Sequence, residues 1–444
     1  MQDNSYYTQV AIIGGGISGS ALLFMLSRYT DVESISIFEK YDSPASLNSS
    51  AKSNSQTLHI GEIETNYSLE KAIKVKKTSS MVANYIKKFN YEDKIGFSIP
   101  KMVLAVGEEE IERLKERYIE FKPHFPKIEL WDEEKLREIE PKLLEERVEP
   151  VLAMGTKEQI TTVDYGELSK TFIKNSLKDS NTAISTHFET DVLEITKKWD
   201  NFLIHTNKGD FMAKFVVVDA GAHSLLLAHK MGYGDDYAML PIGGSFFFAK
   251  EKLLNNKVYT MQHPKLPFAA VHGDPDLTAD WKTRFGPTAF ATPKLERFHT
   301  MEIGNLFNLL NIDRSVLSVY KGLMGDDDIR RYILRNFAHE LPGFGREFFI
   351  KEAQKIIPSL KSEDIEYADG YGGMRPQIID KKNKTLLLGE AKINIEEGII
   401  FNMTPSPGAS SCLGNAMSDT EIICKFLGAN ILKSKIKKEL LNDK

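Results

Sequence analysis

The hydrophobic pattern begins with a short apolar run at residues 10–13, which stops at three consecutive glycines. Residues 20–27 then have the composition of a buried helix, and residues 34–38 form a second β-rich apolar run that ends at Glu39. A strand, a glycine loop, a helix and a second strand in this order predict a βαβ unit. Its length is about right for a dinucleotide-binding fold, so we expect that fold here.

The rest of the chain alternates between helical and strand-like patterns. Residues 68–145 are helical in pattern and dense in Lys and Glu, with an apolar interruption at residues 101–106. Short strand-like runs dominate residues 183–219, and alternating aromatic and small residues at 241–293 suit a broad β-sheet. Residues 294–357 are again helical in pattern, and the chain then returns to strand, glycine-rich loop and helix.

Length indicates how these elements are divided. A chain of 444 residues exceeds the usual limit of one hydrophobic core, so two lobes are expected. The predicted fold class is α/β (α+β), with a Rossmann-type nucleotide lobe and a substrate lobe that holds a large mixed β-sheet and helices. The predicted nucleotide-binding domain is discontinuous and takes residues 1–80, 150–238 and 366–444. The predicted substrate-binding domain takes residues 81–149 and 239–365.

Composition indicates the class of the protein and the compartment in which it works. A hydrophobic content of 42% and a charged content of 27% are those of an ordinary soluble protein, and a net charge of −5 gives no reason to expect nucleic-acid binding. Cys412 and Cys424 form neither a disulfide framework nor metal-ligand spacing, which fits a reducing compartment. No signal peptide and no apolar stretch near the ~20 residues of a membrane span is recognisable. We therefore expect a cytoplasmic protein whose membrane contact, if any, is peripheral.

The glycine loop has the spacing Gly14-x-Gly16-x-x-Gly19 between a strand and a helix. The first glycine permits the tight turn, the second lets the backbone approach a pyrophosphate, and the third lets the helix pack closely on the strand. The positive end of the helix then receives the phosphates. Glu39 follows the loop at the position from which a carboxylate accepts the hydroxyls of the adenosine ribose. This part of the chain predicts dinucleotide binding.

Two further segments favour FAD over NAD. Residues 215–222 form a buried strand that runs into small residues, similar to the second flavin-side signature of glutathione-reductase-like FAD proteins. Residues 404–411 open a predicted helix whose N-terminus would direct backbone N–H groups at the flavin pyrimidine carbonyl. A simple NAD dehydrogenase uses neither feature, so we predict FAD as the cofactor.

Five stretches spread over most of the chain carry a family resemblance. They are Gly14–Gly19 with Glu39, Ser53–His59 with Glu64–Tyr67, Leu240–Phe247, His272–Asp274 with Phe285–Ala289, and Gly372–Ile379 with Ser406–Ser410. Together they resemble the D-amino-acid-oxidase-type flavoproteins and, within them, the malate:quinone oxidoreductases. The third and fifth stretches are the most specific to that family, and the second and fourth also resemble 2-hydroxyglutarate oxidases and dehydrogenases. The resemblance implies a two-lobed glutathione-reductase/D-amino-acid-oxidase-like FAD fold.

Two departures from the family pattern indicate a divergent branch. Gln56 and Leu58 stand in a loop that is usually richer in glycine and alanine. The arginine that often follows the family's His-x-Asp pair is absent, and Pro275 and Asp276 occupy that neighbourhood. Arg284 is a candidate to replace it.

The resemblance implies oxidation of (S)-malate to oxaloacetate, with electrons passed to a membrane quinone. The flavin would take a hydride at N5 from C2 of malate, and a histidine would take the hydroxyl proton. Two alternatives stay open. One is a 2-hydroxyglutarate or other 2-hydroxy-acid oxidase or dehydrogenase of the same fold, and the other is a non-catalytic flavin-binding protein whose second lobe binds a partner.

Four residues are the predicted catalytic set. His272 is the first choice for the base, and Asp274 lies two residues on, where a strand would point it to the same face. Arg375 is predicted to bind a carboxylate of the substrate, because its planar fork matches both oxygens. His59 has two open readings, as a contact to substrate or flavin and as a hydrogen-bonded core residue.

The predicted cofactor contacts come from the glycine loop, the acid after it and several small-residue turns, and no metal site is expected. They are Gly14, Gly16, Ile17, Ser18, Gly19, Glu39, Lys40, Ser53, Asn54, Ser55, Gln56, Val192, Ala220, Gly221, Gly373, Ser406, Pro407, Gly408, Ala409 and Ser410.

Residues 431–441 are basic and partly amphipathic, the composition of an interfacial helix or of a solvated terminal one. Attachment to the inner face of the cytoplasmic membrane is therefore expected mainly from the family resemblance.

Overall fold

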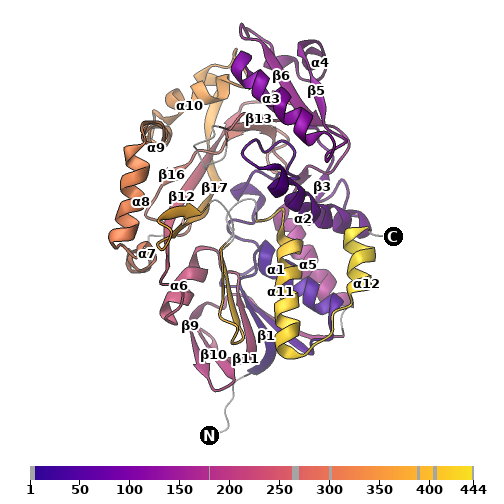
Figure 1. Ribbon diagram of the computed structural model, residues 1–444, viewed down its shortest axis with the longest axis vertical. Helices are drawn as coiled ribbons and strands as arrows, with labels where there is room; N and C mark the ends of the chain where they lie inside the picture. Colours follow the sequence, from indigo (N-terminus) through magenta and orange to yellow (C-terminus); the bar gives the residue numbers. More distant parts are fainter. Residues whose placement is uncertain are drawn as a thin grey trace.

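The computed structural model describes residues 6–179, 181–262, 270–299, 303–387, 391–403 and 408–442. Within these ranges the chain builds two large sheets, of eight and ten strands, and one small two-stranded sheet, β3 (Gly96–Phe97) with β7 (Thr162–Val163). The first large sheet and its helices make the lower part of the molecule in Figure 1, and the second makes the upper part.

The first sheet has the strand order β19-β20-β11-β1-β2-β8, with β10 pairing β11 and β9 pairing β10. Its central strands are parallel, β1 to both β2 and β11, and β11 to β20. The predicted βαβ unit is present as β1, α1 and β2. The bounds are β1 (Tyr6–Ile13), β2 (Ser34–Phe38), β8 (Ala183–His187), β9 (Val192–Lys198), β10 (Asn201–Thr206), β11 (Gly209–Val218), β19 (Ala391–Asn394) and β20 (Ile399–Met403).

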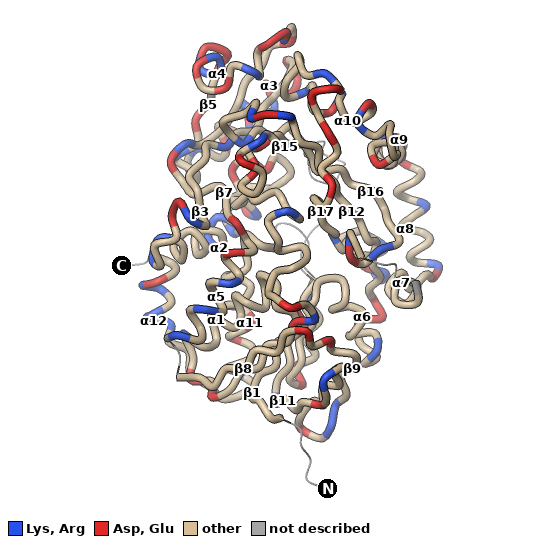
Figure 2. Tube along the Cα trace, turned by 180° about the vertical axis from the view of Figure 1, so that it is seen from behind, with Lys and Arg blue, Asp and Glu red and all other residues tan. Residues whose placement is uncertain are grey.

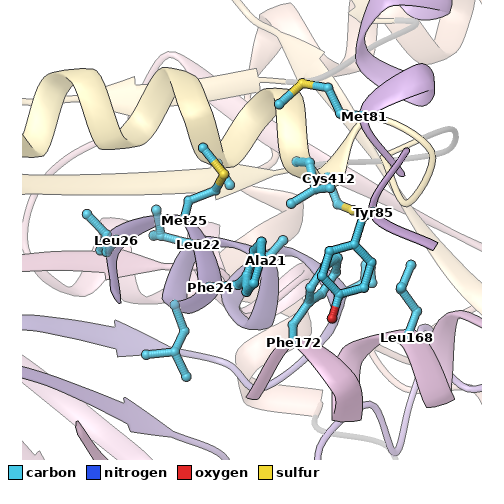
Figure 3. Packing of buried hydrophobic residues seen from close by; sticks show 14 of the residues in the cluster. Ala21, Leu22, Phe24, Met25, Leu26, Met81, Tyr85, Leu168, Phe172 and Cys412 are labelled. Carbon is cyan, nitrogen blue, oxygen red and sulfur yellow. The ribbon is translucent and has the colours of Figure 1, made fainter. Parts of the chain in front are cut away.

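Helix α1 (Ile17–Tyr29) is almost wholly buried because three helices enclose it with the sheet. Its neighbours are α2 (Leu69–Lys88), α5 (Tyr165–Asp179) and α11 (Cys412–Leu427). Figure 3 shows the packing: Phe24 of α1 meets the ring of Tyr85 edge-on at 5.0 Å between centroids, and Tyr85 lies 4.5 Å from Phe172. This aromatic core fixes α1, whose first residues follow the glycine loop. Helix α6 (Ala222–Lys230) follows β11 and contacts β20.

The second sheet has the order β18-β17-β12-β15-β14-β13-β4-β6-β5, with β16 pairing β12. Its longest pair is β12 with β17, joined antiparallel from Tyr237↔Asp380 to Ala249↔Ile365. The bounds are β4 (Lys101–Val106), β5 (Glu129–Trp131), β6 (Val151–Thr156), β12 (Tyr237–Ala249), β13 (Lys257–Thr260), β14 (His272–Pro275), β15 (Thr283–Gly286), β16 (Phe290–Ala291), β17 (Ile365–Asp380) and β18 (Thr385–Leu387).

Helices cover the outer parts of this second sheet. They are α3 (Glu108–Phe121), α4 (Glu133–Ile139), α7 (Ile303–Leu310), α8 (Arg314–Gly325), α9 (Asp327–His339) and α10 (Gly345–Gln354). Helices α7 to α10 lie one after another along one edge of the molecule, drawn in orange in Figure 1. Short turns of 3-10 helix are η1 (Ala51–Ser53), η2 (Pro141–Leu143) and η3 (Ser362–Asp364).

Three strands lie in a different sheet from the one that the predicted domain limits suggest. β6 falls within the range 150–238 of the predicted nucleotide-binding domain, and β17 and β18 fall almost wholly within its range 366–444, yet all three pair in the second sheet. A short apolar run carries no mark of its partner strand, because pairing is set by tertiary contacts. The division into two domains stays a prediction, with these three strands moved to the substrate side.

The C-terminal tail packs on the protein instead of projecting from it. It forms α12 (Lys433–Ile436) and the helical turn η4 (Lys437–Leu441), in which Ile436 and Leu440 are buried. Glu439 accepts hydrogen bonds from Arg28 at 2.8 Å and from Tyr29 at 2.9 Å. Ile436 and Leu440 are therefore covered by the protein, whereas Leu432 is exposed, and the choice between an interfacial and a solvated tail stays a prediction. Over the described ranges, no helix is long and apolar enough to cross a bilayer.

Candidate functional site

A cavity of about 440 Å³ lies at the carboxyl ends of β1, β2 and β11 and extends to β12 and β17 of the second sheet. Its size is within the range of cofactor and substrate sites, and its position is the crevice in which parallel α/β sheets bind ligands. Its walls include the glycine loop, the segment after β2, residues 45–49 and 53–55, the turn after β11, part of β17 and residues 408–410.

The glycine loop is built by close approaches that side chains would block. Gly14 has φ +109°, and a Cβ atom on it would lie 2.4 Å from the carbonyl oxygen of Asp219 at the end of β11. A Cβ atom on Gly19 would lie 2.0 Å from the oxygen of Gly14. The loop therefore brings β1, α1 and β11 together so closely that only glycine is tolerated at both positions.

The start of α1 faces the cavity in a form suited to an anion. The N-cap residue Gly16 has no side chain with which to cap the helix, and the first turn carries no acid. Ser49 Oγ accepts a hydrogen bond from the backbone N–H of Ile17 at 3.0 Å. The positive end of a 13-residue helix without an acidic group fits a pyrophosphate.

Glu39 is held at the next position along the cavity. Its Oε2 accepts a hydrogen bond from Gly15 N–H at 2.8 Å, and its Oε1 accepts one from Tyr41 N–H at 3.0 Å. Burial raises the pKa of this carboxyl, and the backbone hydrogen bonds oppose that rise. Each oxygen keeps a second lone pair, so the carboxylate can accept ribose hydroxyls. The residues of this end fit the adenosine and pyrophosphate of a dinucleotide.

Most of the predicted cofactor contacts line the cavity. Those that do are Gly14, Gly16, Ile17, Ser18, Glu39, Lys40, Ser53, Asn54, Ser55, Val192, Ala220, Gly221, Gly373, Gly408, Ala409 and Ser410. Ser406 and Pro407 lie outside the described residues.

Gly19 and Gln56 are not on the cavity wall, for different reasons. Gly19 packs on the loop behind it. Gln56 is buried and links two segments, because its amide donates to Asp276 at 3.0 Å and its oxygen accepts from Leu277 N–H at 3.0 Å. The polar residue that departs from the family pattern thus has a structural contact.

Several lining residues were not predicted from the sequence. They include Tyr41, residues 45–49, His223, Phe246, Glu296 and Asn305. Residues 45–49 follow Glu39 closely and are rich in serine, which is a local signal that could have been used. Glu296, in the segment between β16 and α7, reaches the wall and pairs with Lys40 at 2.6 Å, and no local pattern indicates such a contact.

His59 lines the same cavity, next to the buried carboxylate of Glu64. Its Nδ1 lies 2.7 Å from Oε1 of Glu64, and its backbone N–H donates to Ser410 Oγ at 2.9 Å. Burial raises the pKa of Glu64, but Lys101, 3.8 Å away, and His59 together lower it to about 2. An ionised carboxylate only accepts hydrogen bonds, so Nδ1 carries the proton and Nε2 is the basic nitrogen.

His272 lies behind the cavity wall and not on it. The imidazole is buried on β14 and stacks on Tyr259 at 4.5 Å between centroids. Asp274 does share its face, with Oδ1 3.7 Å from Nε2 of His272, but its other oxygen is 2.5 Å from Lys257 Nζ. Neither ring nitrogen has a hydrogen-bond partner among the described residues, and burial lowers the pKa of His272 to about 3.

Arg284 and Arg375, the two candidate carboxylate ligands, have different surroundings. Arg284 is fully buried, 2.7 Å from Asp276 and under the ring of Phe246, so it does not replace the missing arginine at the cavity. Arg375 of β17 lines the cavity, and burial lowers its pKa. Within the described part of the chain no carboxylate acts on its guanidinium, whose titratable neighbours are Tyr332 and Tyr259. It is therefore the arginine that can bind an incoming carboxylate.

Replacing Gly14 with Ala should destabilise the fold and abolish dinucleotide binding. The methyl group would meet the Asp219 carbonyl oxygen, and a positive φ is strained for alanine, which together should cost at least about 2 kcal/mol. Thermal unfolding and the flavin content of the purified protein measure both effects. Gly322→Ala on α8, where a Cβ atom would meet nothing within 4 Å, is the matched control and should be at least as stable as the parent, because alanine favours a helix over glycine. Equal behaviour of the two variants would contradict this reading.

The neutral His272 ring predicts a pH dependence of stability. The pKa of His272 is about 3 in the folded protein, against an ordinary value of 6.5. Between these pH values the unfolded chain therefore binds more protons than the folded protein. The free energy of unfolding therefore falls by up to about 1.4 kcal/mol per pH unit as the pH drops through this window. His272→Gln should reduce that slope in urea unfolding at pH 4 to 6.5, whereas His124→Gln on the surface should leave it unchanged. An undiminished slope in His272→Gln would mean that the ring is not buried neutral.

Solved structures with this architecture include an oxidase with FAD bound and a glycine oxidase. L-α-Glycerophosphate oxidase from Mycoplasma pneumoniae with FAD bound superposes with a TM-score of 0.66 at 20% identity, covering 94% of each chain. Glycine oxidase from Geobacillus kaustophilus gives a TM-score of 0.63 at 18% identity, covering 95% of each chain. The chain has the two-lobed fold of the FAD-dependent oxidoreductases, and the fold class predicted from the sequence is confirmed.

Sequence comparison identifies the family within this class. A family model described as malate:quinone oxidoreductase (Mqo) matches residues 6–440. Malate:quinone oxidoreductase from Helicobacter pylori is 43% identical over 438 residues, covering 97% of this chain and 97% of that protein. A probable malate:quinone oxidoreductase from Campylobacter jejuni is 49% identical over 443 residues, covering 97% of this chain and 98% of that protein. The chain belongs to the malate:quinone oxidoreductase family and is an oxidoreductase, as the resemblance of its motifs indicated.

Proposed function

We propose that this protein binds FAD in the cavity and oxidises (S)-malate to oxaloacetate, with a quinone as the electron acceptor. The observation that carries the proposal is that one cavity is lined both by a dinucleotide cradle and by His59 and Arg375. The family and the fold both support it, since the relatives are named for malate and quinone and a structural neighbour contains FAD.

The glycine loop, Glu39 and the start of α1 would hold the adenosine and pyrophosphate of the cofactor. Gly373 lets β17 approach the loop at residues 53–55 beside the cavity, because a Cβ atom on it would lie 2.3 Å from the Ser53 carbonyl oxygen. When bound, the flavin supplies the two-electron acceptor for the hydride from C2 of malate. The protein supplies the proton acceptor, the carboxylate ligand and the orientation.

His59 is the base in this proposal, in place of His272. Nε2 of His59 would take the proton of the malate hydroxyl while Glu64, held ionised by Lys101, stabilises the imidazolium that forms. His272 has no such carboxylate contact at hydrogen-bond distance and stands behind Tyr259. Arg375 would fix one carboxylate of malate through two parallel hydrogen bonds. Loss of one hydride and one proton balances the conversion of the alcohol to the ketone.

An anaerobic assay with purified protein tests the proposal. Malate should bleach the flavin absorbance, and a dichlorophenol dye or a soluble quinone should restore it and sustain turnover. A panel with 2-hydroxyglutarate and peroxide detection covers the related 2-hydroxy-acid oxidases. Flavin-containing protein that malate does not reduce would overturn the proposal, and reduction by no 2-hydroxy acid would favour the non-catalytic flavin-binding alternative.

A further inference from the structure

Helices α7 to α10 expose an unusual number of large apolar side chains. Nearly half of the exposed large hydrophobic residues in the described part of the chain lie between residues 298 and 348. They are Phe298, Phe307, Ile312, Leu317, Met324, Leu334, Phe337, Leu341, Phe344 and Phe348. Single exposed apolar side chains are common on soluble proteins, whereas a concentration of them on consecutive helices indicates a surface that binds something.

The exposed residues follow helical periodicity, so they form outward stripes and are not scattered. Leu317 and Met324 are two turns apart on α8, and Leu334 and Phe337 are one turn apart on α9. Leu334 is 60% exposed and Phe344, just before α10, is 67% exposed. A helix that packs on a core by one face and still carries apolar residues on the other has an unpartnered second face.

The charges of this edge are mixed and locally balanced. Residues 303–354 contain equal numbers of basic and acidic residues, and Figure 2 shows both along α8 to α10. The exposed arginines pair with neighbouring acids, as Arg330 does with Asp327 at 2.6 Å and Arg331 with Asp328 at 2.9 Å. Such a surface has no net attraction for a strongly charged partner, but paired charges suit zwitterionic lipid headgroups, which carry both signs.

The inner sides of the same helices reach the cavity. Asn305 of α7 lines the cavity. Tyr332 of α9 is close to Arg375: burial raises the pKa of Tyr332, and the Arg375 guanidinium partly opposes that rise. The exposed Phe307 and Leu334 stand on the outer sides of these two helices. The outer face of α7 is therefore opposite a residue that lines the proposed site, and the outer face of α9 is opposite a neighbour of Arg375.

We infer that the outer face of α7 to α10 docks on the surface of a lipid bilayer, where the quinone acceptor is dissolved. The inference rests on the proposed quinone acceptor. Apolar stripes with mixed charge favour insertion at the headgroup boundary, driven mainly by burial of apolar area. Docking by this face places the wall of the cavity against the membrane, which shortens the path between an apolar acceptor and the site.

Vesicle binding of a matched pair of triple variants tests the inference. The face variant is Leu334→Gln, Phe337→Gln and Phe344→Gln, and the control is Ile119→Gln, Val148→Gln and Trp199→Gln, which are exposed elsewhere. Flotation with phosphatidylcholine vesicles, with and without phosphatidylglycerol, measures partition of the FAD-loaded protein. The face variant should partition at least about tenfold less than the parent, and the control like the parent. Added salt should change parent binding little, because the face has no net charge.

Activity separates this inference from the proposed function. With malate and a soluble dye, the parent and both triple variants should be equally active, and loss of that activity in the parent would refute the proposed function instead. With a long-chain quinone in vesicles as the acceptor, the turnover rate should fall in the face variant and stay at the parent value in the control. Unchanged vesicle binding by the face variant would overturn the docking face. The docking face would also be overturned if the parent were a dimer, the face variant a monomer, and vesicle binding the same for both. A second copy of the chain would then cover the face.

Discussion

Malate reduces the flavin of a His59→Ala variant about 10²- to 10⁴-fold more slowly than that of the parent, if His59 is the base as proposed. The reason is the geometry at the cavity: His59 lines the wall, and Glu64 2.7 Å away fixes its proton on Nδ1 and leaves Nε2 basic. Anaerobic stopped-flow reduction at saturating malate measures the effect, with the flavin content of each variant determined first. Glu64→Gln should fall between the parent and His59→Ala, because it keeps the hydrogen bond and loses the charge.

Two histidine variants are the controls for this result. His272→Gln removes the other candidate base, and His223→Gln removes the other histidine that lines the cavity among the described residues. Both should reduce within a few-fold of the parent. If His272→Gln stops reduction and His59→Ala does not, the base is His272, and the cavity must open further toward β14 when substrate binds.

Arg375→Met should lower kcat/KM for malate by about 10²- to 10³-fold, mainly through KM. The guanidinium lines the cavity and has no carboxylate partner among the described residues, so a substrate carboxylate would lose a charge-assisted pair of hydrogen bonds. Arg375→Lys should recover only part of the loss, because an ammonium group cannot make both bonds in one plane. Initial rates over a wide malate range, with a soluble dye as acceptor, separate KM from kcat.

Arg335→Met is the control for the arginine series, since Arg335 is exposed on α9 and pairs with Glu352 at 2.9 Å. It should leave both parameters unchanged. An Arg375→Met variant with normal KM for malate would show that another group binds the carboxylate, and the proposed orientation of the substrate would then be wrong.

Local sequence accounts for the part of the site that local geometry builds. The βαβ unit, the glycine loop and Glu39 are adjacent in sequence, and each has a spacing that follows from strand and helix geometry. The alternation of side chains along a strand also predicted that His272 and Asp274 share a face, as they do. What the same pattern could not show is burial: β14 is covered on both sides, so His272 is held neutral behind Tyr259.

The remaining features depend on chain segments that are far apart in sequence. Glu296 reaches the cavity across the two sheets, Gln56 is held by residues beyond position 270, and the basic tail is packed on α1 by Ile436 and Leu440. None of these contacts has a local signal, because each depends on which surfaces meet after folding.

The amino-acid sequence by itself determined the nucleotide fold, the family and a set of residues that includes His59 and Arg375. Only the tertiary structure decided which histidine meets the cavity, which arginine is without a carboxylate partner on its wall, and which apolar face is left uncovered. The physical reason is that burial, pairing of charges and exposure are properties of packed surfaces, whereas periodicity and motif spacing are properties of a single segment.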